Sequence, residues 1–190
     1  MHLDACLDWV GAIYGKQIYT TKVPKKFKKF HISILEMLNI LLAIRVWSTQ
    51  WTGCEIRVHC DNAAVVSVLN NGKTKDKDLA AIARNIFMAC AKFDRNIFMA
   101  CAKFDRNIFM ACAKFDIHLY VTHIQGTKNT VADLLSRWTG SPAQNAKLKE
   151  LVPNFEWITI NEKKKFILII VSDSLFLYLY IFRLSLNLVK

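Results

Sequence analysis

The stretch Val58-His59-Cys60-Asp61-Asn62 combines the end of an alternating strand with an acid. Upstream of the acid, Ile56, Val58 and Cys60 alternate with polar residues, which is the pattern of a half-buried strand. Downstream, residues 63–69 form an apolar helical run, for which Asn62 is well placed as the N-cap. Open α/β sheets bind ligands where a strand's C-terminal end faces a helix start. The stretch therefore predicts an α/β fold with Asp61 at its functional edge.

Further strands and helices are expected on both sides of this stretch. Residues 3–7, 10–14 and 17–20 are short runs separated by turn residues, which predicts an antiparallel meander. Residues 117–121 predict a fifth strand. The expected helices span 34–47 with Ser33 as N-cap, a segment that begins at Leu79, and 129–137.

One segment is repeated without any change. Arg-Asn-Ile-Phe-Met-Ala-Cys-Ala-Lys-Phe-Asp stands at 84–94, at 95–105 and at 106–116, which indicates a recent duplication in the coding DNA. Eleven residues are close to three helical turns, so the second helix is expected to extend into the copies. Either two copies fold back as a helical hairpin, which we favour, or the acid after the next strand, Asp133, is displaced.

Charge and cysteine content narrow the function classes. The net charge of +11 and the pI near 9.5 favour a polyanionic partner, either nucleic acid or an anionic membrane surface. Three of the six cysteines are copies within the repeat, and Cys6, Cys54 and Cys60 show no metal-ligand spacing. We therefore expect reduced thiols and an intracellular protein, in the nucleus or the cytoplasm.

The C-terminal part changes in character. Residues 141–165 are expected to be a linker, and residues 166–189 are almost wholly apolar apart from Asp173 and Arg183. The length of this tail suits a transmembrane helix, whereas the two charges argue against one. The tail is therefore either a membrane span, which would make the protein membrane-associated, or read-through sequence. At the other end, Met1 leads directly into strand-like sequence, which indicates a fragment of a longer protein.

Four acids lie within or beside apolar segments: Asp4, Glu36, Asp61 and Asp133. A buried carboxylate is costly unless it is paired or bound to a metal. Four converging carboxylates would repel one another unless divalent cations lay between them, and Mg²⁺ prefers such oxygen ligands. Two ions about 3.5–4 Å apart are the arrangement that cleaves phosphodiesters. The acids therefore predict a metal-dependent nuclease.

The order of these elements and acids resembles the ribonuclease H domain of retroelement reverse transcriptases, of the gypsy-type and DIRS-like groups. The resemblance covers roughly residues 1–140 and rests on five motifs, at 3–6, 31–40, 59–66, 72–76 and 123–137. It implies a five-stranded mixed sheet, three antiparallel strands and then two parallel ones, flanked by helices. To this we add the extended repeat-containing helix and an apolar C-terminal helix.

The resemblance also implies a site and a substrate. Asp4, Glu36, Asp61 and Asp133 would bind two Mg²⁺ ions, with Mn²⁺ as an alternative, and His123 would assist product release. The substrate would be the RNA strand of an RNA–DNA hybrid, cut endonucleolytically to leave a 3′-hydroxyl. Exposed lysines are expected either to contact backbone phosphates or to form solvated loops. These are Lys22, Lys25, Lys26, Lys28, Lys29, Lys73 and Lys75.

Three other functions remain open at this point. The chain is alternatively a catalytically inactive retroelement relic, a small membrane-anchored protein whose tail matters most, or a module that binds hybrids without cleaving them. The sequence does not specify an oligomeric state.

Overall fold

The computed structural model describes residues 1–90 and 117–160. The predictions on the repeat beyond residue 90 and on the tail at 166–189 lie outside the described residues. In chain order the elements are β1 (His2–Ala5), β2 (Trp9–Tyr14), β3 (Gln17–Lys22), η1 (Lys25–Phe27), α1 (Ile32–Trp51), β4 (Glu55–Cys60), α2 (Ala63–Asn71), α3 (Lys77–Cys90), β5 (His118–His123), η3 (Gly126–Lys128), α5 (Thr130–Ser136), α6 (Pro142–Leu151) and β6 (Glu156–Trp157).

The strands form one mixed sheet in the order β5-β4-β1-β2-β3-β6. The pairs β1–β2 and β2–β3 are antiparallel, whereas β1–β4, β4–β5 and β3–β6 are parallel. A mixed sheet flanked by helices is therefore confirmed. The sheet has six strands rather than the expected five, because the backbone of residues 156–158 pairs with β3. Ile18 accepts a hydrogen bond at 2.8 Å from the backbone N–H of Ile158.

Helix α1 is the core of the fold, and it packs against β1, β2 and α3. Its side chains are buried almost without interruption from Ser33 to Ile44. Within the described residues it is also the one helix whose length and composition would suit a membrane span, but 78% of that window is buried inside the protein. The helix begins at Ile32, before the expected start, because Nδ1 of His31 accepts the Ser33 N–H. His31, and not Ser33, is therefore the N-cap.

Asn39 fixes α1 against the meander. Its side chain is fully buried, and its Nδ2 donates to the backbone carbonyls of Asp4 and Gly11, at 2.9 Å each. Its Oδ1 accepts a hydrogen bond from the hydroxyl of Tyr19 at 2.7 Å. One carboxamide thus links the helix to β1, β2 and β3. These contacts fix the position of Glu36, which lies one turn earlier on α1, along β1.

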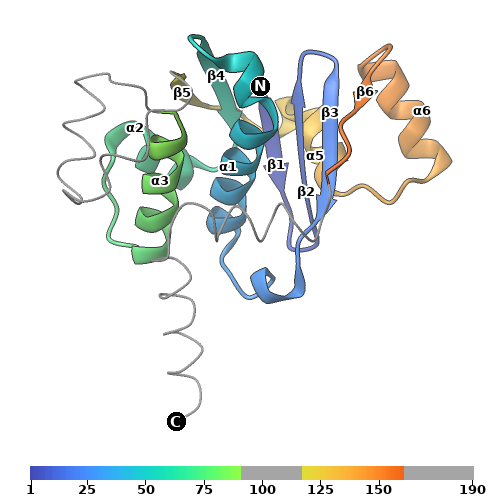
Figure 1. Cartoon of the computed structure of the whole chain (residues 1–190). Coiled ribbons are helices and arrows are strands. Elements are labelled where there is room, and N and C mark those ends of the chain that lie inside the picture. The colour runs from blue at the N-terminus through green and yellow to red at the C-terminus, as the bar shows by residue number, and fades with distance from the viewer. Residues whose placement is uncertain (91–116, 161–190) are drawn as a thin grey trace. The chain divides into compact units, whose positions relative to one another are not determined.

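Helix α5 packs on β1 and β2, on the face opposite α1 (Figure 1). The approach is close because Gly11 of β2 has no side chain. A Cβ at Gly11 would lie 2.4 Å from Cβ of Leu135 and 2.8 Å from the backbone nitrogen of Ser136. The hydroxyl of Thr20 also donates to the Leu135 carbonyl at 2.7 Å. Gly11 therefore determines how near α5, with Asp133, comes to β1.

We expect Gly11→Ala to lower the free energy of unfolding by about 1–3 kcal/mol, because the added methyl overlaps backbone atoms of α5 that have to move. Urea unfolding at equilibrium measures this. The exposed change Ser67→Ala on α2 is the control and should alter the free energy of unfolding by about 0.5 kcal/mol or less. Equal midpoints for Gly11→Ala and wild type would contradict the close approach of α5.

The segment after residue 140, expected to be part of a linker, contributes α6 and β6 to the domain. Leu148 and Val152 pack with Ile18 and Leu135 in one buried cluster. The described residues up to Ile160 accordingly belong to one compact unit, Met1–Ile160. Helix α6 buries only one residue, Leu148, so the segment lacks the apolar periodicity from which a helix could have been predicted.

Candidate metal centre

The strand register brings two of the predicted acids side by side. β1 and β4 are parallel neighbours, and His2 pairs with His59. Asp4 follows two residues after His2 on β1, and Asp61 follows two residues after His59 at the end of β4. Both acids therefore lie at the same edge of the sheet, where the carboxyl ends of parallel strands meet.

Glu36 reaches this edge from α1 and is almost completely buried, with 2% of its surface exposed. Its Oε1 accepts the backbone N–H of Ala5 at 2.9 Å, and its Oε2 lies 3.9 Å from the thiol of Cys60. Burial, followed by the negative charges of Asp4 and Asp61, raises the pKa of Glu36 to about 9. The metal-free centre thus retains a proton on Glu36 at neutral pH.

Asp4 interacts electrostatically with each of the other three acids. It is buried, and its Oδ2 accepts a hydrogen bond from the hydroxyl of Ser136 on α5. Burial raises the pKa of Asp4 from its ordinary value, and the charges of Asp61 and Asp133 raise it further, while Ser136 and Arg137 lower it. Since Asp4 also acts on Glu36, its carboxylate is within electrostatic reach of the other three.

Asp133 lies at the exposed rim of the centre. Half of its side-chain surface is accessible, and Nε of Arg137 donates to its Oδ1 at 2.9 Å. An exposed ion pair of this kind contributes about 0.3–0.5 kcal/mol, so it would exchange readily for a stronger ligand.

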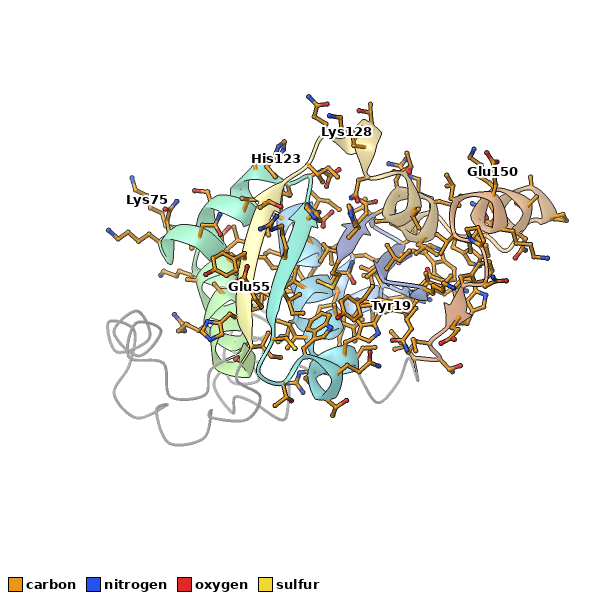
Figure 2. The ribbon with its side chains drawn as sticks, turned by 90° about the horizontal axis from the view of Figure 1, so that it is seen from above. Tyr19, Glu55, Lys75, His123, Lys128 and Glu150 are labelled. Atoms are coloured by element: carbon orange, nitrogen blue, oxygen red, sulfur yellow. The ribbon has the colours of Figure 1, made fainter. Side chains whose placement is uncertain are left out.

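The loop between β5 and α5 borders Asp61. Gly126 is so near that a Cβ there would lie 3.3 Å from Oδ2 of Asp61. The exposed ring of His123 lies 3.1 Å from the Asp61 backbone carbonyl through Nε2. Because a carbonyl only accepts, Nε2 carries the proton in this contact. Figure 2 shows His123 and Lys128 at the same end of the sheet.

Cys60 belongs to the centre, contrary to the expectation from its sequence spacing. One ligand atom each of Glu36, Cys60 and Asp61 lie within 4.8 Å of one another, a spacing at which these residues could hold a metal ion. Spacing missed this group because Glu36 is 24 residues away on another element. The strand alternation carries the signal that would have found it, since Cys60 shares the buried side of β4 with Val58.

Sequence reasoning also missed Ser136, which holds Asp4. Its hydroxyl contacts both the Asp4 carboxylate and the Asp133 carbonyl, the latter at 3.0 Å. The signal was present in the spacing, because a residue three positions after Asp133 lies on the same helix face.

The comparisons with known proteins identify no family. A scan of the chain against protein-family models gives no match. A search of the curated proteins gives no matching relative either. The resemblance to ribonuclease H therefore rests on the sequence motifs and stays a prediction.

The predicted phosphate-binding lysines divide into two groups. Lys22 is the last residue of β3 and pairs with Trp9, so it lies at the same edge of the sheet as the C-terminal end of β1, near Asp4. The other lysines of the first group lie in the exposed segment around η1. Lys22, Lys26 and Lys29 lie over aromatic rings, and Lys28 pairs with Asp8.

The second group, Lys73 and Lys75, lies away from the acids. These lysines follow α2, which starts beside Asp61 and runs for nine residues. That length corresponds to about 14 Å, so the second group lies at the far end of the helix. Figure 2 shows Lys75 pointing outward on this side of the molecule.

Proposed function

We propose that this chain is a metal-dependent nuclease of the ribonuclease H type, which cleaves the RNA strand of RNA–DNA hybrids. The observation that carries the proposal is the convergence of Asp4, Glu36, Asp61 and Asp133. They come from β1, α1, the end of β4 and α5, and they meet at one edge of the sheet. Carboxylates gathered in this way raise one another's pKa values, which a fold tolerates best when a cation compensates them.

The donor set fits a hard divalent cation. Four carboxylates supply oxygen ligands, which Mg²⁺ prefers, and Mn²⁺ accepts the same ligands. Asp4, Glu36, Asp61 and Asp133 would hold the ions. When bound, such ions lower the pKa of a water and stabilise charge on the leaving oxygen of a phosphodiester.

The residues around the acids orient them. The Ala5 N–H fixes Oε1 of Glu36, and the Ser136 hydroxyl fixes Oδ2 of Asp4, so neither buried carboxylate is free to rotate. We assign His123 to the product side, because its ring is exposed and lies directly beside Asp61. Its Nε2–H would donate to a phosphate oxygen of the cleaved strand.

The surrounding charge favours a nucleic-acid substrate. The chain carries a net charge of +11, and the lysines from Lys22 to Lys29 begin at the edge of the sheet that holds the acids. Contacts from lysines to phosphates position a duplex without reading its sequence. Specificity for a hybrid would then come from the shape of the duplex and from its 2′-hydroxyls.

Incubation of the full-length protein with an end-labelled RNA–DNA hybrid tests the proposal. We expect Mg²⁺-dependent RNA products that end in a 3′-hydroxyl, restored by Mn²⁺ after treatment with EDTA, and no cleavage of the DNA strand. Strong cleavage in EDTA would refute the assignment. Salt-sensitive binding of the hybrid without any products would favour the alternative, a module that binds hybrids without cleaving them.

A further inference from the structure

The thiol of Cys60 is a ligand that a magnesium centre does not use. It is fully buried at the end of β4, and its sulfur lies 3.9 Å from Oε2 of Glu36. The ligand atoms of Glu36, Cys60 and Asp61 all lie within 4.8 Å of one another. Mg²⁺ takes oxygen ligands, whereas sulfur ligands select softer ions such as Zn²⁺.

The spacing of these atoms suits zinc. Zn–S bonds of about 2.3 Å and Zn–O bonds of about 2.1 Å place sulfur and oxygen about 3.6 Å apart at a tetrahedral angle. The observed separation of 3.9 Å between Sγ of Cys60 and Oε2 of Glu36 is within a few tenths of an ångström of that value. The Ala5 N–H holds Oε1, which leaves Oε2 as the oxygen beside the sulfur.

The three ligands come from separate parts of the fold. Glu36 projects from the second turn of α1, Cys60 ends β4, and Asp61 opens the link to α2. Together they form a set of one sulfur and two carboxylates, to which a water would add the fourth ligand of a tetrahedral zinc site. Catalytic zinc sites have three protein ligands plus a water, whereas structural zinc sites have four protein ligands.

We propose that Glu36, Cys60 and Asp61 form a zinc site that overlaps the magnesium centre, so that Zn²⁺ displaces Mg²⁺ and holds the nuclease inactive. On binding, the Cys60 thiol and the Glu36 carboxyl each release a proton to solvent, and the thiolate and the carboxylate bond to the metal. Zn²⁺ binds such a site more tightly than a hard ion does, since affinity rises along the first-row series and sulfur adds to it. The inhibitory part rests on the proposed function, whereas the binding part does not.

Titration of the full-length protein with Co²⁺, a coloured substitute for Zn²⁺, tests the binding part. We expect the near-ultraviolet absorbance of a sulfur-to-cobalt bond in wild type, and its loss when Zn²⁺ is added. Cys60→Ser and Cys60→Ala should both lack this absorbance, and Cys60→Ala keeps a small apolar side chain at the buried position. Cys54→Ser, which changes an exposed thiol away from the acids, is the matched control and should keep it.

Two results overturn the zinc site: no sulfur-to-cobalt absorbance in wild type, or the same absorbance in the Cys60 variants. For the inhibitory part, the Zn²⁺ concentration that halves each protein's own rate should rise at least about tenfold in Cys60→Ser. Equal sensitivity to Zn²⁺ would contradict competition at this centre. Absence of cleavage with every metal, together with the absorbance in wild type, would refute the proposed nuclease and leave the zinc site standing.

Discussion

Asp61→Asn is expected to reduce Mg²⁺-dependent cleavage of the hybrid by about 1,000-fold or more, while the fold and hybrid binding are kept. The carboxylate is half-buried at the end of β4, between the buried acids and the loop that contains Gly126. Its loss removes a ligand whose ions supply several kcal/mol of transition-state stabilisation, and each 1.4 kcal/mol corresponds to about a factor of ten. The amide has nearly the same volume, and the backbone carbonyl still contacts His123.

Single-turnover cleavage and hybrid binding, both measured on the full-length protein, check this result. Glu150→Gln is the matched control, because it makes the same kind of change on α6, at the far side of the domain (Figure 2). It should cleave at the wild-type rate within about a factor of two. Cleavage by Asp61→Asn at the rate of this control would show that Asp61 binds no catalytic ion.

The sequence singled out Asp4 and Asp61 because each lies within or beside an apolar strand. That the two acids lie at the same edge follows from the parallel pairing of β1 with β4, which only the structure supplies. The cap at Asn62, by contrast, was predictable. Its side chain accepts the N–H groups of Ala64 and Val65, which is the ordinary role of asparagine before a helix.

Other features leave no comparable trace in one sequence. β6 consists of two residues that join the sheet through backbone atoms, so no side-chain pattern marks it. His31 caps α1 through a ring nitrogen, whereas capping rules favour the serine at position 33. The raised pKa of Glu36 arises because α1 is covered on almost every side, and that burial exists only after β1, β2 and α3 have packed against it.

The buried Glu36 destabilises the fold when it is ionised, although the ionised form is the one that would bind a metal ion for cleavage. Its pKa rises from an ordinary 4.5 to about 9 in the folded protein. Without divalent ions, the folded state therefore keeps a proton that the unfolded chain releases above pH 4.5. The stability that this proton contributes is fully present below pH 4.5 and is lost as the pH rises toward 9.

We expect wild type in EDTA to lose roughly 3 kcal/mol of unfolding free energy between pH 5.5 and pH 8 because Glu36 ionises. The free energy of unfolding of Glu36→Gln should change less with pH over the same range, because a carboxamide does not ionise. This variant should also be more stable than wild type at pH 8. Its oxygen can still accept the Ala5 N–H. Urea unfolding at the two pH values measures the free energy of unfolding of both proteins. In the difference between the two proteins, the contributions of groups that titrate alike in both cancel.

Divalent ions should reverse this order of stability. A bound ion at about 100 times its dissociation constant stabilises the folded state by about 2.7 kcal/mol, and at pH 8 it favours the ionised form of Glu36. Mg²⁺ or Mn²⁺ should therefore stabilise wild type and Glu150→Gln strongly, and Glu36→Gln much less. If the ions stabilise Glu36→Gln as much as wild type, Glu36 is a buried structural acid, and the metal centre would have to be formed by Asp4, Asp61 and Asp133 without it.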